Sequence, residues 1–230
     1  MTGQKFKEYR LKKGWTQVKA AMHLDVSQPY LALLERGKRK VPEKLTRKAV
    51  RVYGVSPAAL PTNPSPVRQV EDDKLARELA ALGYPGFAYM KGGWKRNPVE
   101  VLLTALAKPN LEARQVEALP WVLLNYPDMD RNELVAHARS ENLSNKLGFV
   151  VSLAKLVAEK LDPVDSPRAL WLSQLEKDLS ASRLLAEGTL CQDSLSTRER
   201  EWLRENRTKE AEYWNLLTKW KPEHLQYAAT

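Results

Sequence analysis

Apolar residues recur at helical spacing along most of the chain, and residues 16–37 show the most informative version of this pattern. Here two short helices are predicted on either side of an interruption at residues 25–27. Thr16 and Ser27 stand where N-cap residues are expected, because their hydroxyl oxygens can accept the free N–H groups of a first helical turn. The residues expected to face inward are Val18, Ala21, Met22 and Leu24 in the first helix, and Leu31 and Leu34 in the second.

The second of these helices is expected to keep a different set of residues on its outer face. By helical spacing this face carries Gln28, Pro29, Ala32 and Arg36. Two short helices joined by a tight turn are typical of a helix-turn-helix, which places its second helix in the major groove of DNA. The pattern therefore predicts a DNA-reading element.

Residues 3 to about 60 resemble the XRE family of helix-turn-helix domains, also called lambda-repressor-like or Cro/C1-type. The segments that carry the resemblance are KFKEYRLKKGWTQVKAA, DVSQPYLALLERGKRKVP and LTRKAVRVYGVSPAAL. The resemblance implies a five-helix domain in which Gln17 opens the second helix and Gln28 lies near the start of the third, the recognition helix. It also implies that Glu35 braces Arg10, which makes both charges structural.

Two residues depart from the family pattern. Asp25 stands where most members have a glycine in a left-handed turn, a conformation that aspartate tolerates at small cost. Pro29 occupies a position where other members often carry a base-contacting side chain. Proline is harmless in a first helical turn, but it limits base reading there to apolar contact, such as with a thymine methyl group.

The charge of the chain is concentrated in the same region. Residues 1–60 contain 14 lysines and arginines and 4 acidic residues, whereas the whole chain has 37 and 28. The remaining 170 residues are therefore near neutral. Because basic side chains displace counterions from phosphates, this distribution favours double-stranded DNA as the partner of the first domain.

Each DNA-facing residue can be given an expected role. Gln28 is the candidate for base reading, because an amide can pair with both N6 and N7 of adenine. Gln17 is expected to bind a phosphate and to orient Gln28, and Ser27 and Tyr30 to contact the backbone or a base edge. Phosphate contacts fix the register without reading sequence, and the candidates for them are Arg36, Lys38, Arg39 and Lys40.

The rest of the chain is predicted to be all-α. Prolines make residues 61–67 a stiff linker, after which 68–161 read as a helical middle domain and 162–230 as a C-terminal helical hairpin. Asn110 is expected to cap a helix over 111–124 that Pro120 kinks or splits. The next predicted helix runs through about 142, and an apolar helix over 147–161 forms the centre of the middle domain. Capping residues Ser166 and Ser196 open the two helices of the hairpin.

Four of the seven tryptophans lie in the last third of the chain, where they suggest either a core or an interface with another protein. They are Trp171, Trp202, Trp214 and Trp220.

The sequence offers little catalytic chemistry. The three histidines are scattered, and none of the common nucleophile, phosphate-loop or dinucleotide motifs is present. His23 is expected to be structural, and Cys191 has no evident base beside it. We therefore predict a protein that is not an enzyme and has no metal or cofactor. With no signal peptide, no membrane span and a single cysteine, the expected location is a bacterial cytoplasm, in association with the nucleoid.

Two functions fit a basic helix-turn-helix followed by neutral helices. In the first, the chain is the antitoxin of a toxin–antitoxin operon, which represses its own promoter and binds a toxin through its helical C-terminal region. In the second, it is a repressor whose extra helices dimerise and sense a small ligand. Operators of such domains are normally two-fold, so a homodimer is expected in either case.

Overall fold

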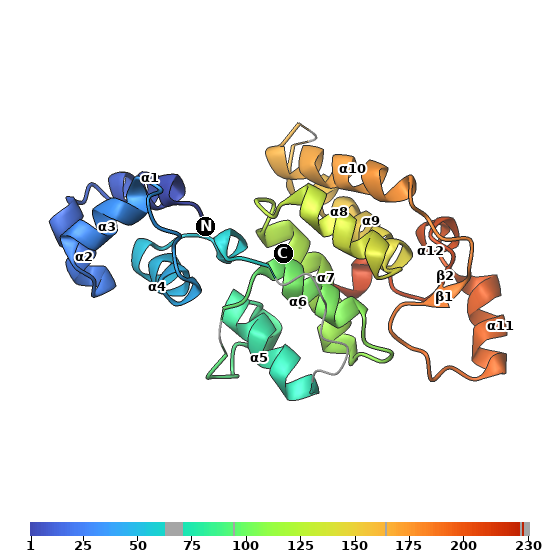
Figure 1. Ribbon diagram of the computed structural model, residues 1–230. Helices are drawn as coiled ribbons and strands as arrows, with labels where there is room; N and C mark the ends of the chain where they lie inside the picture. The colour runs from blue at the N-terminus through green and yellow to red at the C-terminus, as the bar shows by residue number, and fades with distance from the viewer. Residues whose placement is uncertain (63–70, 94, 164, 226, 228–230) are drawn as a thin grey trace. The chain divides into compact units, whose positions relative to one another are not determined.

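The computed structural model describes residues 1–62, 71–93, 95–163, 165–225 and 227 (Figure 1). The chain divides into two compact units, Met1–Thr62 and Asn63–Thr230. Both are helical, which confirms the all-α prediction; the only strands in the described part are two of two residues each. The proline-rich linker predicted at 61–67 lies, apart from Pro61 and Thr62, outside the described residues.

The first unit contains four α-helices and one short 3₁₀ turn. The fifth helix implied by the family resemblance is this single turn, in which Ser56 caps a segment that begins with proline. The elements are α1 (Gly3–Lys12), α2 (Gln17–Leu24), α3 (Gln28–Glu35), α4 (Glu43–Tyr53) and the 3₁₀ turn Pro57–Ala59.

The ends of α2 and α3 form as the sequence predicts. Thr16 Oγ1 accepts a hydrogen bond from Lys19 N, and Ser27 Oγ accepts one from Tyr30 N. Asp25 takes the left-handed conformation, with φ 57°, so it serves as the turn residue in place of glycine. The helix-turn-helix geometry is therefore fixed by local caps on both sides of the turn.

The inward face of α2 differs from the predicted one. Val18 and Met22 are 60% and 76% exposed, whereas Ala20, Ala21 and Leu24 are buried. In a helix of two turns, the small side chains of Ala20 and Ala21 let the neighbouring helices approach, and the bulkier residues are left outside. Ala32, predicted on the outer face of α3, is also buried, at 4% exposure.

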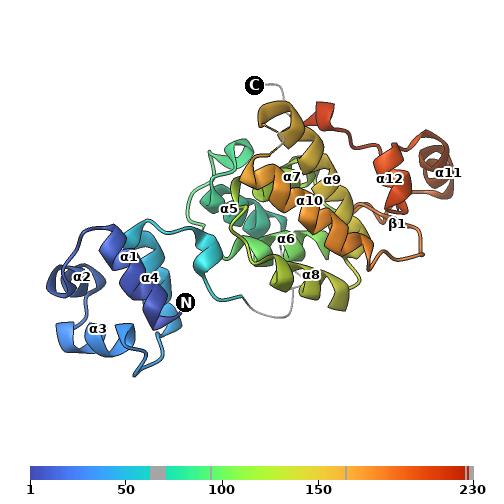
Figure 2. The same cartoon turned by 90° about the horizontal axis from the view of Figure 1, so that it is seen from above.

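The second unit is built around the long helix α9 (Ser144–Leu161). Helices α7 (Ala113–Asn125), α8 (Arg131–Ser140) and α10 (Pro167–Ser180) pack against it, and α10 runs beside it in both views (Figures 1 and 2). The other elements are α5 (Asp72–Leu82), a 3₁₀ turn (Pro85–Phe87), α6 (Pro98–Leu106), β1 (Gly188–Thr189), α11 (Thr197–Asn206), α12 (Lys209–Tyr213), β2 (Leu216–Leu217) and a 3₁₀ turn (Pro222–His224).

The predicted boundary at 161/162 does not separate two compact units. Leu172, Leu175 and Leu179 of α10 are buried, and α10 packs more extensively on α9 than any other helix does, so both belong to one core. Nor do α10 and α11 form a long helical hairpin. Helix α10 ends at Ser180, and α11 is followed by the short α12 and by β2, which pairs in parallel with β1.

Two smaller expectations for this unit were wrong. Glu112, rather than Asn110, caps α7 in a capping box with Gln115, and Asn110 instead accepts a hydrogen bond from Ser194 N. Helix α7 also continues through Pro120, so the split that was one of the two predicted outcomes does not occur. Most of this helix is buried around the proline, and that packing offsets the missing backbone hydrogen bond.

The four tryptophans in the last third differ in burial, and Trp171 and Trp220 are half-buried. Trp214 is fully buried, and its indole N–H donates to Ser152 Oγ at 2.9 Å. Its ring lies so close to Gly148 of α9 that a Cβ there would approach it to 2.4 Å. Trp202 of α11, in contrast, is 54% exposed.

Candidate nucleic-acid interface

A buried ion pair joins α1 to α3 at the base of the helix-turn-helix. Arg10 Nε lies 2.6 Å from Glu35 Oε1, and Arg10 Nη2 lies 2.9 Å from Oε2. Arg10 Nη1 also donates to the carbonyl of Trp15, just before α2. The arginine thus holds three parts of the fold together, which confirms the structural role expected for the pair.

The ion pair continues as a chain of hydrogen bonds to the surface. Gln17 Nε2 donates to Glu35 Oε2 at 2.9 Å, and Gln28 Nε2 donates to Gln17 Oε1 at 2.9 Å. A carboxylate only accepts hydrogen bonds, so Glu35 fixes the amide of Gln17 with its nitrogen inward and its oxygen toward Gln28. The buried charge therefore sets the orientation of an exposed side chain on α3.

This orientation leaves the amide of Gln28 with both kinds of hydrogen-bonding group available. One N–H is used by Gln17, while the second N–H and both lone pairs of Oε1 take part in no hydrogen bond among the described residues. Donation to N7 of adenine and acceptance from its N6 amino group need one donor and one acceptor of this kind. Gln28 is exposed at the first position of α3.

The protonation of Glu35 supports the same arrangement. Burial would raise the pKa of this carboxyl, but hydrogen bonds from Arg10 and Gln17 and the charge of Arg10 outweigh it and lower the pKa below its usual value. The hydrogen bond to Glu35 likewise raises the pKa of Arg10, against the effect of burial. Both groups are charged at neutral pH, as the chain of hydrogen bonds to Gln28 requires.

The remaining α3 candidates differ in accessibility. Ser27 and Pro29 are exposed, and Tyr30 is half-buried with the guanidinium of Arg39 5.8 Å from its ring. The buried Ala32 has no surface to offer a base. Sequence periodicity alone missed this, because alanine is short enough to be covered by its larger neighbours on α3 and the helices beside it.

A basic turn follows α3 directly. Four exposed cations lie within five residues around Gly37, which adopts a positive φ of 72°. Across the described ranges none of the four forms an ion pair with a carboxylate. They are Arg36, Lys38, Arg39 and Lys40.

Lys19 is a further exposed cation of the helix-turn-helix, and the sequence did not predict a role for it. It is exposed on the first turn of α2, and its ammonium lies 5.5 Å from the ring of Trp15. Trp15 in turn stacks on His23 with ring centroids 4.3 Å apart, which gives His23 a structural contact. The only sequence signal for Lys19 was its position two residues after Gln17.

Within the part of the chain that the structure describes, the histidines and the cysteine do not assemble into a catalytic or metal site. His137 lies 4.0 Å from Glu133, and no group of three potential metal ligands occurs there. Burial raises the pKa of the Cys191 thiol to about 11, so at neutral pH it is not a thiolate nucleophile. None of the described helices combines the length and apolar character needed to cross a membrane.

Residues 3–62 match a protein family described as helix-turn-helix domain. The match agrees with the first compact unit, and it covers about a quarter of the chain. No curated protein and no solved structure matches the sequence. The chain therefore contains a helix-turn-helix domain, and this domain supports a function in DNA binding.

Proposed function

We propose that this protein is a sequence-specific transcriptional repressor of the XRE type, which inserts α3 into the major groove and reads an adenine with Gln28. The observation that carries the proposal is the chain of hydrogen bonds from the buried Arg10–Glu35 pair through Gln17 to Gln28. A side chain held in place before binding loses less conformational freedom on contact with a base. Such a regulator acts by binding and needs no catalytic centre.

The surrounding residues position the domain on the duplex. Gln17 and Ser27 are at helix N-termini, where a phosphate is favoured, and Tyr30 is beside them on α3. Pro29 offers an apolar contact to a thymine methyl. We assign phosphate contacts to Arg36, Lys38, Arg39 and Lys40. Ala32 keeps only a packing role, because it is buried.

The operator is proposed to be two-fold, with a homodimer on half-sites about one helical turn apart. A repressor of this kind acts on the nucleoid in a bacterial cytoplasm. The direct test is binding of the full chain to the DNA upstream of its own gene, measured by fluorescence anisotropy. A shuffled duplex of the same composition serves as the control. Equal affinity for both duplexes would refute sequence-specific repression.

For the second unit, we propose a role in binding a partner protein, as in the antitoxin of a toxin–antitoxin operon. Its near-neutral charge makes DNA an unfavourable partner for this part of the chain. The exposed Trp202 on α11 is of the residue type most enriched at the centres of protein interfaces. If the product of the neighbouring gene is the partner, it should co-purify with the full chain. Failure of every co-transcribed product to do so would contradict the antitoxin role.

The second candidate, a repressor that senses a small ligand, is favoured by one observation. Helix α11 and the loop before it line a cavity of about 290 Å³, near the lower end of the size range of small-molecule sites. A metabolite that raises the melting temperature of the protein without a bound partner would support this function over the antitoxin.

Replacing Gln28 by alanine tests base reading. We expect Gln28→Ala to reduce operator affinity by about 1–3 kcal/mol, because it removes a bidentate contact to one base pair. The loss should be confined to one position in each half-site, as measured by anisotropy on single-base operator variants. A uniform loss across all variants would show that Gln28 supports the fold or the phosphate contacts instead.

Replacing Lys38 by alanine tests the phosphate contacts. We expect Lys38→Ala to weaken binding to every duplex and to reduce the slope of log K against log salt by about 0.9, the value for one phosphate contact. Lys177→Ala is the matched control, since Lys177 is an exposed lysine on α10 of the second unit. An unchanged slope in Lys38→Ala, or an equal change in both variants, would remove Lys38 from the interface.

A further inference from the structure

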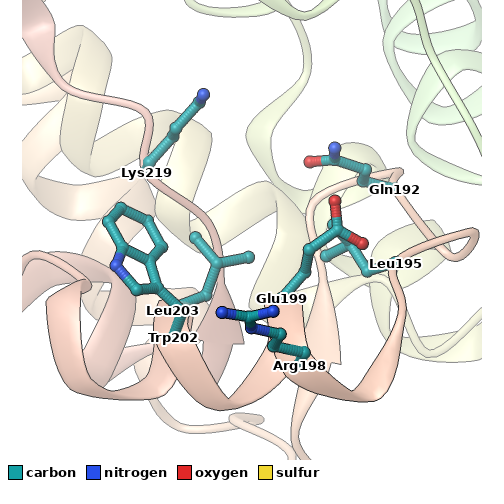
Figure 3. Close-up of a pocket in the computed structure, with 7 residues that line it drawn as sticks. All are labelled: Gln192, Leu195, Arg198, Glu199, Trp202, Leu203 and Lys219. Carbon is teal, nitrogen blue, oxygen red and sulfur yellow. The ribbon is translucent and has the colours of Figure 1, made fainter.

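The cavity beside α11 has a mixed apolar and cationic lining. Leu195 and Leu203 contribute apolar surface, and the indole of Trp202 stands at one side (Figure 3). Arg198 and Lys219 supply two positive charges, and Glu199 one negative charge. The lining thus carries a net positive charge next to an exposed aromatic ring.

The side chains of the two cations are available to a ligand. Among the described residues, neither the guanidinium of Arg198 nor the ammonium of Lys219 forms a hydrogen bond or an ion pair. Glu199, in contrast, is hydrogen-bonded within the protein. Its Oε2 accepts from both the backbone N–H and the hydroxyl of Ser196 in the N-terminal capping box of α11. These hydrogen bonds lower the pKa of Glu199, which keeps it charged and occupied as part of the helix cap.

The wall formed by the loop before α11 is held in place by several contacts. Arg200 donates to the carbonyls of Leu195 and Asp193, and the backbone N–H of Ser194 donates to Asn110. Asp193 accepts a further hydrogen bond from the hydroxyl of Thr189 in β1. A pocket whose walls are already ordered loses less conformational entropy when a ligand binds.

Figure 3 shows how charge is arranged along the cavity. Lys219 and Trp202 are drawn at one end, and the guanidinium of Arg198 extends toward the same side. The carboxylate of Glu199 and the amide of Gln192 are drawn at the other end. An anionic group is therefore favoured at the end with the indole and the two cations, and repelled at the Glu199 end.

We propose that this cavity is a binding site for a small monocarboxylate with an apolar, preferably aromatic, body. The body would pack on Trp202 and Leu203, and the carboxylate would accept hydrogen bonds from Arg198 and Lys219. The cavity volume of about 290 Å³ accommodates one ring with a short acidic side chain. The proposal deepens the ligand-sensing candidate, and it does not depend on DNA binding.

The test measures binding to the full chain in the absence of DNA. Hydrocinnamate is the probe, hydrocinnamamide is its neutral counterpart and acetate lacks the apolar body. We expect calorimetry to give a saturable affinity for hydrocinnamate at least about tenfold higher than for either control compound. Its binding should also change the tryptophan fluorescence, and this change should be absent in Trp202→Phe.

Variants of exposed lining residues separate the contribution of the indole from that of the positive charge to hydrocinnamate binding. Trp202→Ala and Lys219→Glu should each weaken hydrocinnamate binding about tenfold or more. Lys177→Glu, an exposed lysine outside this cavity, should leave it unchanged. Absence of saturable binding, equal affinity for the acid and the amide, or wild-type affinity in Trp202→Ala would each overturn the proposal. Operator binding by the same preparations shows independently whether the DNA-binding function holds.

Discussion

Glu35→Ala is expected to destabilise the DNA-binding unit by about 3–5 kcal/mol, because it leaves the buried guanidinium of Arg10 without its partner. The substitution also frees Gln17 from the carboxylate that orients it, so Gln28 loses its support. At temperatures where the variant is still folded, operator affinity should fall as well. Urea denaturation of the full chain, with operator binding as the readout, measures the loss of stability. The operator affinity of the folded variant in the absence of urea measures the second effect.

Glu43→Ala is the matched control within the same unit. Glu43 pairs with Arg47 one turn along α4, but both side chains are largely exposed, so the expected loss is only about 0.5 kcal/mol. Similar losses in the two variants would contradict the structural role of the buried pair.

The same pair predicts a pH dependence. The pKa of Glu35 is lowered in the folded state, so its stabilisation is complete above the ordinary value of about 4.3. This stabilisation is lost as the pH falls through the lowered pKa. Glu35→Ala should lack this component of acid destabilisation, which denaturation at a series of acidic pH values would detect.

Trp214→Ala is expected to destabilise the second unit by about 3–5 kcal/mol. The indole is fully buried against α9, and its loss creates a cavity and removes the hydrogen bond to Ser152. The DNA-binding unit has its own core, so operator binding by the folded fraction should be retained. Denaturant unfolding monitored by near-ultraviolet circular dichroism reports on the second unit.

Trp202→Ala provides a control with the same chemical change. Because Trp202 is more than half exposed, its removal should alter the stability of the second unit by no more than about 0.5 kcal/mol. If Trp202→Ala were as destabilising as Trp214→Ala, the assignment of one tryptophan to the core and the other to the surface would be wrong.

The sequence was most informative where local chemistry decides the structure. The caps at Thr16, Ser27 and Ser196 and the left-handed turn at Asp25 form as predicted, because each depends on neighbouring backbone groups. The resemblance to helix-turn-helix domains added the Arg10–Glu35 pair, a contact between residues far apart in the sequence. The DNA contacts assigned to Gln28 and the basic turn remain predictions.

The predictions failed where packing between distant segments decides the outcome. In α2, an apolar face that includes Val18 and Met22 is as compatible with helical spacing as the one observed, and only the neighbouring helices select between them. The cavity beside α11 could not be predicted, since Lys219 comes from a segment beyond β2. The division at 161/162 failed for the same reason, because helix periodicity does not show that α10 packs on α9.

Selection of binding sites from a random pool of duplexes tests the central claim most directly. Full-length wild-type protein should enrich a two-fold motif, and Gln28→Ala should enrich the same motif without its preference at one symmetric position. Enrichment of no motif by the wild type, or an identical motif with both proteins, would contradict the claim that α3 presents Gln28 to the bases of an operator.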